Sequence, residues 1–186
     1  MKKVSAIIVN WNDKDVITEC IQSLLDQDTK QIEIIISDNG SKDGSIDLLR
    51  RLFPSIKIIE NKKNLGFGSA INRGLAIASG DFLLFLNSDL KLDPKCIREL
   101  TKLLERDSNI GGVIPKILYI DRENTINSLG VLVNYTGIAY PNLLDQQDPN
   151  WMEPFESACG GIFMLRREVY ETVGGFDEDL FLYHED

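Results

Sequence analysis

Residues 80–89 have the sequence GDFLLFLNSD, in which five consecutive apolar residues precede an amide, a hydroxyl and a carboxylate. A short continuous apolar run of this kind is typical of a β-strand covered on both faces, as in a parallel sheet. The glycine before it and the polar residues after it mark its two ends. The segment therefore predicts a buried central strand with polar side chains at its carboxyl end.

Three further apolar runs precede this strand and alternate with amphipathic helical patterns. Strands are predicted over 4–9, 32–37 and 56–59, and helices over 17–25, 45–53 and 68–79. Another helix is expected after Pro94, with an apolar face formed by Ile97, Leu100, Leu103 and Leu104. Because strands that alternate with helices form right-handed βαβ units, we expect an α/β fold with a mostly parallel sheet.

The pattern changes beyond residue 107. Strand-like segments are expected over 111–119, 126–140 and 159–165, the last followed by a short helix over 167–170, and the polar stretch 143–154 predicts a mobile loop. There is no internal repeat and no linker, so the 186 residues predict a single domain.

Composition limits the possible ligands. Twenty Lys and Arg against 29 Asp and Glu give a net charge of −9, which disfavours binding of polymeric nucleic acid. A small phosphorylated ligand would need a metal ion or local backbone amides. No segment is apolar over the roughly twenty residues that a helix needs to span a bilayer. The three cysteines, Cys20, Cys96 and Cys159, are interpreted as ordinary thiols of a reducing compartment.

Polar side chains follow all four predicted parallel strands, whose carboxyl ends share the ligand-binding edge of an open sheet. They are Asn10 to Asn12, Asp38 to Ser41, Asn61 to Gly68, and Asn87 to Asp89. Asp38 could bind a ribose hydroxyl or base N–H, or it could open an Asx turn. Trp11 could stack on a base, or it could belong to the core.

The segments 64–74 and 87–89 suggest different ligands. The first, NLGFGSAINRG, lacks the third glycine of a dinucleotide-binding motif and follows the wrong strand for one. The second supplies oxygen ligands that suit Mg²⁺ or Mn²⁺, with a helix cap or turn as the alternative interpretation. A cation at Asp89 would hold phosphates that the acidic chain otherwise repels.

The final residues FLYHED carry two adjacent carboxylates, Glu185 and Asp186. A carboxylate near a metal-bound diphosphate can accept the proton of an acceptor hydroxyl as a general base. An acidic tail without function is the alternative, and the only histidine, His184, is interpreted as a surface residue.

In their order and spacing, six motifs make the sequence similar to inverting glycosyltransferases of family 2, which have the GT-A (nucleotide-diphospho-sugar transferase) fold. The resemblance covers nearly the whole chain and is greatest to the rhamnosyltransferase-like branch that builds bacterial surface polysaccharides. It implies an α/β/α sandwich with a nucleotide-binding half over 1–107 and the start of an acceptor half over 108–186. The motifs are VSAIIVNWN (4–12), SDNGSKDGS (37–45), NLGFGSAINRG (64–74), GDFLLFLNSD (80–89), ACGGIFMLRR (158–167) and GGFDEDLFLYHED (174–186).

The resemblance also implies a role for each matching position. Asp89 matches the last acid of the D-x-D motif and would bind Mn²⁺ or Mg²⁺, whereas Asn87 replaces the first acid. Asp186 matches the catalytic base of the E-D motif, with Glu185 as second choice. A UDP- or dTDP-sugar would be bound by Val9, Asn10, Trp11, Asp38, Asn64, Gly66, Asn87, Ser88, Gly160 and Gly161.

The implied reaction is in-line attack of a saccharide or lipid-linked hydroxyl on the anomeric carbon of the donor. It implies a cytoplasmic protein, with peripheral association of the full-length form at the inner face of the membrane. Family members usually continue past the E-D motif, so we expect a chain truncated there, with donor binding but little transfer. Two alternative functions stay open. One is a sugar-nucleotide nucleotidyltransferase, which would need a glycine-rich basic loop where residues 9–15 are VNWNDKD, and the other is a non-catalytic nucleotide-binding module.

Overall fold

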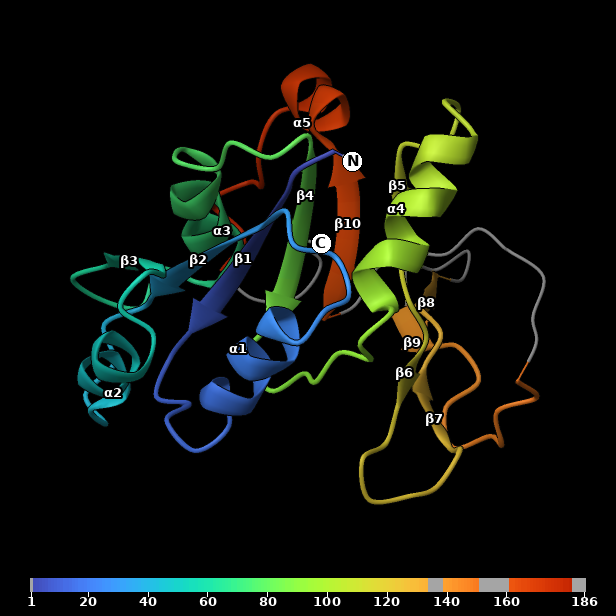
Figure 1. Cartoon of the computed structure of the whole chain (residues 1–186), viewed down its shortest axis with the longest axis horizontal. Coiled ribbons are helices and arrows are strands. Elements are labelled where there is room, and N and C mark those ends of the chain that lie inside the picture. The colour runs from blue at the N-terminus through green and yellow to red at the C-terminus, as the bar shows by residue number, and fades with distance from the viewer. Residues whose placement is uncertain (1, 134–138, 151–160, 182–186) are drawn as a thin grey trace.

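The computed structural model describes residues 2–133, 139–150 and 161–181 (Figure 1). Its centre is a six-stranded sheet with the strand order β3-β2-β1-β4-β10-β5. The first four strands in the chain are mutually parallel, and β10 is antiparallel to both β4 and β5. The strands of this sheet are β1 (Val4–Asn10), β2 (Ile32–Asp38), β3 (Lys57–Glu60), β4 (Phe82–Asn87), β5 (Gly112–Val113) and β10 (Ile162–Arg166).

Helices cover both faces of the sheet, which explains why its central strands are apolar along their whole length. One buried cluster joins the sheet to α1, α2 and α4, and a second joins its other face to α3. The mixed α/β, mostly parallel architecture expected from the sequence is confirmed. The helices are α1 (Ile17–Leu25), α2 (Ser45–Leu52), α3 (Phe67–Leu75), α4 (Cys96–Arg106) and α5 (Arg167–Val173).

The second part of the chain departs from the expected long strands. Pro115 lies in the expected strand 111–119, which the structure divides into β5 and β6 (Ile117–Leu118). The expected strand 126–140 is likewise divided, into β7 (Ile126–Ser128), β8 (Val131–Val133) and the beginning of β9 (Ala139–Pro141), with Gly130 at a φ of +77° between the first two. Proline cannot donate to a sheet and glycine allows the turn, so both residues end strands here.

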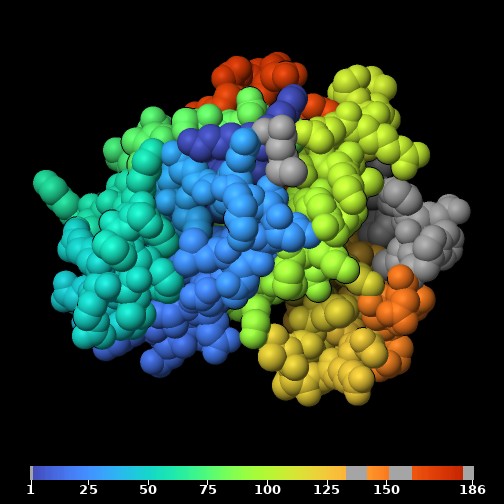
Figure 2. Space-filling model, in the orientation of Figure 1, coloured from blue at the N-terminus to red at the C-terminus, as the bar shows by residue number. Residues whose placement is uncertain are grey.

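The pairs β6–β7 and β8–β9 form two small antiparallel sheets beyond the edge of the main sheet, beside α4 (Figure 1). Figure 2 shows the same division on the surface, with the blue-to-green first hundred residues on one side and the yellow and orange residues on the other. Within the expected loop 143–154, Gln147 makes an isolated antiparallel bridge with Thr125, so the described part of this loop is tied to β7.

Helix ends and one apolar position also differ from expectation. The expected helix 68–79 ends earlier, at Leu75. Leu103, expected on the buried face of α4, is 40% exposed, because Ile97, Leu100 and Leu104 already fill the contact with the sheet. No described helix is long and apolar enough to cross a membrane.

A half-buried carboxylate ties the amino ends of the parallel strands together. Glu33 of β2 accepts hydrogen bonds from Ser5 Oγ (2.6 Å), Lys57 Nζ (2.6 Å) and the backbone N–H of Ser79 (3.0 Å). Burial alone would raise the pKa of Glu33, but these hydrogen bonds outweigh it and hold the pKa well below its ordinary value. The ionised carboxylate therefore fixes the edge of the sheet opposite to the candidate site.

Candidate functional site

The carboxyl ends of β1, β2 and β4 meet at one edge of the sheet. Asn10 is in register with Asp38, and Val9 with Asn87. Because β10 runs in the opposite direction, its beginning reaches the same edge, where Gly161 O accepts a hydrogen bond from the Asn87 N–H (2.9 Å). The chain proceeds from β1 to β2 on one side and returns to β4 on the other. The boundary between β1 and β4 is thus a topological switch point, where open α/β sheets bind ligands.

The buried carboxylate of Asp38 is fully used inside this edge. Its Oδ1 accepts hydrogen bonds from Asn10 Nδ2 (2.6 Å) and Ser41 Oγ (2.5 Å), and its Oδ2 accepts from the backbone N–H groups of Gly40 and Ser41 (3.0 Å each). The structure shows the Asx turn, and binding of a ribose hydroxyl or base N–H by Asp38 stays a prediction. Asn10 Nδ2 also reaches Ser45 Oγ (3.0 Å), so one network joins β1, β2 and α2.

The continuation of β1 is exposed. Trp11 has 53% of its surface exposed, which excludes the alternative of a core tryptophan, whereas Val9 is half-buried. Asn12 adopts a φ of +59°, and its Oδ1 accepts a hydrogen bond from the Lys42 N–H (2.8 Å) while its own N–H donates to Ser41 Oγ (2.9 Å). The loop after β1 is therefore fastened to the loop after β2, with the indole at the surface.

Asn39, which the sequence places among the polar residues after β2 without a role of its own, organises the beginning of α3. Asn39 is 2% exposed, and its Nδ2 donates to Gly66 O (3.1 Å) and to Asn64 Oδ1 (3.2 Å). Asn61 Nδ2 in turn donates to Asn39 Oδ1 (3.1 Å), and Asn64 Oδ1 accepts from the Gly66 N–H (2.9 Å). The only sequence signal for Asn39 is its place as the second polar residue after an apolar strand, and that pattern is also typical of an ordinary turn.

The end of β4 presents one exposed carboxylate, that of Asp89. Ser88 is buried, and its hydroxyl donates to the carboxylate of Asp13, a residue that the sequence analysis did not select. Gly161 faces this turn with a φ of +72°, and a Cβ added to it would lie 3.6 Å from Asn87 Nδ2. The turn formed by Asn87, Ser88 and Asp89 therefore lies against Gly161.

The donor set at the end of β4 fits a magnesium or manganese ion only in part. Carboxylate and amide oxygens are the ligands that these cations prefer. However, within residues 2–133, 139–150 and 161–181 no group of three or more His, Cys, Asp and Glu side chains is placed to hold a metal. Asp89 alone suits a cation whose remaining ligands are water and phosphate oxygens.

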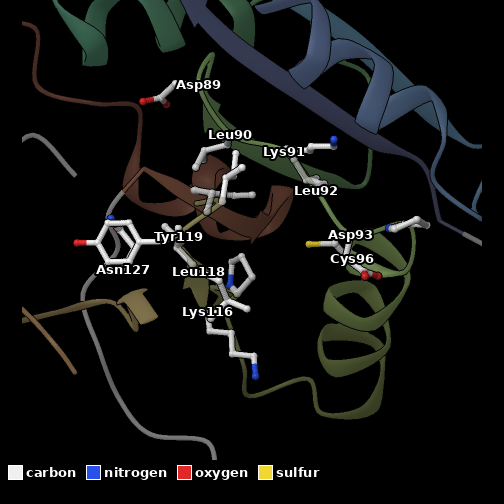
Figure 3. A pocket seen from close by; sticks show the side chains of 15 residues that line it. Asp89, Leu90, Lys91, Leu92, Asp93, Cys96, Lys116, Leu118, Tyr119 and Asn127 are labelled. Atoms are coloured by element: carbon white, nitrogen blue, oxygen red, sulfur yellow. The ribbon is translucent and has the colours of Figure 1, made fainter. Parts of the chain in front are cut away.

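A cavity of about 830 Å³ adjoins Asp89, between the beginning of α4 and the β6–β7 pair. Figure 3 shows Asp89 at one end and Lys116 at the other, with apolar side chains such as Leu90 and Leu118 between them. Lys116 is paired with the buried carboxylate of Asp148. The cavity thus combines apolar walls with a carboxylate next to the proposed phosphate position.

The described thiols have no role as nucleophiles. Burial, with a smaller contribution from the charge of Asp89, raises the pKa of the Cys20 thiol to about 12. Burial and the nearby Asp93 raise the pKa of Cys96 to about 11. Both are free thiols, as expected, and neither ionises near neutral pH. Cys159, Gly160, His184, Glu185 and Asp186 lie outside the described residues.

Comparison with known proteins identifies the family. The family model for Glycosyl transferase family 2 matches residues 5–174. The chain belongs to glycosyl transferase family 2. This assignment confirms the family resemblance, and it does not favour the nucleotidyltransferase alternative.

Curated relatives of this family 2 chain include an O-antigen biosynthesis protein and a rhamnosyltransferase. The O-antigen biosynthesis protein RfbC of Myxococcus xanthus is 30% identical over 189 residues, which cover 95% of this chain and 15% of that protein. The N-acetylglucosaminyl-diphospho-decaprenol L-rhamnosyltransferase of Mycobacterium tuberculosis is 25% identical and covers 84% of this chain and 59% of that protein. The family 2 chain therefore spans only part of the length of these relatives.

Solved structures share the fold. The mannosyltransferase PcManGT from Pyrobaculum calidifontis, in complex with GDP-Man and Mn²⁺, has a TM-score of 0.70 at 21% identity, over 96% of this chain and 48% of that chain. Residues 1–349 of TarS from S. aureus, in complex with UDP, have a TM-score of 0.69 at 19% identity, over 98% of this chain and 52% of that chain. These similarities confirm the expected GT-A type fold.

Proposed function

We propose that this family 2 chain binds a nucleoside diphosphate sugar and takes part in transferring the sugar to an acceptor hydroxyl with inversion at the anomeric carbon. One observation carries the proposal: exposed Trp11 and Asp89 follow adjacent parallel strands at the switch point of the sheet. An aromatic face and a carboxylate at the ends of neighbouring strands suit the base and the cation-bound diphosphate of one ligand. GDP-Man with Mn²⁺ and UDP, which PcManGT and TarS bind, are ligands of this class.

The nucleotide part of the proposed ligand lies over the ends of β1 and β2. Trp11 stacks on the base, and Val9 lines the same position. Asn10 Oδ1 is buried without a hydrogen-bond partner among the described residues, so a ligand N–H or O–H that reaches it would be bound. Asp38 acts through the turn that it holds, since four protein donors already surround its carboxylate. Asn64 and Gly66 border the pocket from the beginning of α3.

The diphosphate lies at the end of β4. Asp89 would hold Mn²⁺ or Mg²⁺ at this position, while Asn87 and Ser88 support the turn to which Asp89 belongs. When bound, the cation neutralises the charge that grows on the leaving diphosphate. This arrangement resolves the conflict between a phosphorylated ligand and a net charge of −9.

The sugar and the acceptor lie on the other side of β4, towards the 108–186 half. Gly161 allows close approach of the donor sugar, a role that the family resemblance also implies for Gly160, and the cavity beside Asp89 receives a saccharide or lipid-linked acceptor. Asp186, with Glu185 as second choice, accepts the proton of the acceptor hydroxyl as that oxygen attacks the anomeric carbon. The UDP- or dTDP-sugar is supplied in the cytoplasm, and the glycan is built at the inner face of the membrane.

A transfer assay with matched variants tests this function. Donor sugars on UDP, dTDP and GDP are offered with Mn²⁺ and with free and prenyl-diphosphate-linked saccharides, and the anomeric configuration of the product is read by NMR. We expect the little transfer that this chain performs to give an inverted linkage, and Asp186→Asn to lower its rate by about 10²- to 10⁴-fold with unchanged donor affinity. A retained configuration contradicts the mechanism, and nucleotide binding without transfer for any donor leaves the binding module as the better account.

A further inference from the structure

The segment 174–181 lies along α3 and is held there by a side chain with no part in the proposed pocket. Asn72 Oδ1 accepts a hydrogen bond from the Phe176 N–H (2.9 Å), and Asn72 Nδ2 donates to Phe176 O (2.9 Å) and to Glu178 Oε1 (3.1 Å). The carboxamide therefore pairs with both backbone groups of one residue, as a neighbouring β-strand would. No other described side chain pairs with the segment at both backbone groups of a single residue.

The segment 174–181 packs so tightly against α3 that the contact has no room for one additional methyl group. A Cβ added to Gly175 would lie 2.4 Å from Asn72 Oδ1, and one added to Gly68 would lie 2.9 Å from Phe176 Cβ. The Phe176 ring packs in edge-to-face contact with Phe67 of α3 (6.2 Å between centroids) and Phe85 of β4 (5.6 Å). Such packing and hydrogen bonding fix the register of the segment on the helix.

The far end of the same segment reaches the proposed donor loop. Gly66, at the N-terminus of α3, adopts a φ of +86°, and a Cβ added to it would lie 2.5 Å from Phe181 O. Gly66 is also the residue that Asn39 and Asn64 hold at the nucleotide edge. Residues 174–181 therefore connect the Asn72 contact to the donor loop, and the chain then continues to Glu185 and Asp186.

We propose that Asn72 is a positioning residue that couples nucleotide binding at the 64–66 loop to the seating of residues 174–181. This inference rests on the proposed function and goes beyond it, because Asn72 touches neither the nucleotide nor the acceptor. A nucleotide that orders the 64–66 loop favours the loop conformation against which Phe181 packs. Residues 174–181, when held by Asn72, favour the same loop conformation in return. Such coupling is reciprocal by thermodynamic necessity.

The experiment measures both directions of the coupling on the same chain. The dissociation constants of UDP, dTDP and GDP with Mn²⁺ are determined by calorimetry, and hydrogen exchange at the Phe176 amide, which donates to Asn72, is followed with and without nucleotide. The variants are Asn72→Ala and Gly175→Ala, which disturb the contact from its two sides. Asn109→Ala, an exposed asparagine in the turn after α4, is the matched control.

We expect nucleotide to slow exchange at Phe176 in the unchanged chain and in the control. Asn72→Ala and Gly175→Ala should each weaken nucleotide binding by at least about fivefold, the lower end of typical coupling, and abolish the nucleotide-dependent protection. Circular dichroism must show that both variants are folded at the assay temperature, and a variant that fails this check is replaced by Asn72→Ser.

A second pair of substitutions, one that adds a negative charge and one that removes the negative charge opposite it, separates positioning from a general loss of stability. Asn72→Asp places a carboxylate against Glu178 and should weaken nucleotide binding as strongly as Asn72→Ala. Adding Glu178→Gln restores a donor opposite that carboxylate and should recover part of the affinity. Faster exchange at Phe176 with an unchanged dissociation constant would overturn the inference, whereas the absence of nucleotide binding in the unchanged chain would overturn the proposed function instead.

Discussion

Replacing Asp38 with asparagine separates its structural role from direct contact with the donor. The substitution converts one carboxylate oxygen into an NH₂ group, so at least two of the four donors around Asp38 lose their acceptor. Hydrogen bonds to a charged group contribute about 1.5–3 kcal/mol each, and three of the four donors belong to the half-buried turn residues Gly40 and Ser41. We therefore expect a loss of about 2–4 kcal/mol in the free energy of unfolding.

Urea denaturation at neutral pH measures this loss, and calorimetry with UDP and Mn²⁺ measures the accompanying change in affinity. Asp47→Asn, an exposed acid in the first turn of α2, is the matched control and should change stability by less than about 1 kcal/mol. The reasoning is refuted if Asp38→Asn leaves the stability unchanged and still abolishes nucleotide binding. That result would mean that the carboxylate binds the ribose or base directly.

Three further predictions follow from the contacts. Trp11→Ala should weaken nucleotide binding by about 1–3 kcal/mol, the usual contribution of base stacking, with little change in thermal stability because the indole is 53% exposed; calorimetry and a melting curve test both parts. Mn²⁺ alone should bind weakly and bind much more tightly with UDP, since Asp89 provides one carboxylate; equal affinity without UDP, seen by titration, would contradict the shared cation site. Folding lowers the pKa of Glu33, so the ionised carboxylate stabilises the fold fully above its unfolded pKa of about 4.3, and this stabilisation is lost as the pH falls below that value. The urea midpoint of Glu33→Gln should therefore change less below a pH of about 4.3 than the midpoint of the unchanged chain.

The sequence predicted the parallel core well because local pattern and tertiary environment agree there. Residues 82–86 are apolar at every position, which predicts a buried strand, and β4 is buried along 82–86. The second half was predicted less well, because two-residue and three-residue strands such as β5 and β7 carry no periodicity of their own. Their positions depend on β10 and on turns at Pro115 and Gly130.

The candidate site was predicted as a set of positions but not as a network. Strand ends located Asn10, Asp38, Asn87 and Asp89 at one edge, since that follows from parallel topology alone. The sequence could not decide whether Asp38 faces a ligand or a turn, because an Asx turn and a ribose contact use the same residue type. The role of Asn39 could not be predicted either, because its hydrogen bonds go to residues 22 to 27 positions away, which no local pattern reveals.

The central claim is that a nucleoside diphosphate binds with a divalent cation between the ends of β1 and β4. Its most direct test is an NMR titration of the ¹⁵N-labelled chain that follows the Trp11 indole and the Gly161 amide, assigned with Trp11→Phe and Gly161→Ala. We predict that UDP, dTDP or GDP with Mg²⁺ shifts both resonances, and that replacing Mg²⁺ with Mn²⁺ broadens them in the unchanged chain but not in Asp89→Ala. If neither resonance responds to any of the three nucleotides, the site is not where the account places it.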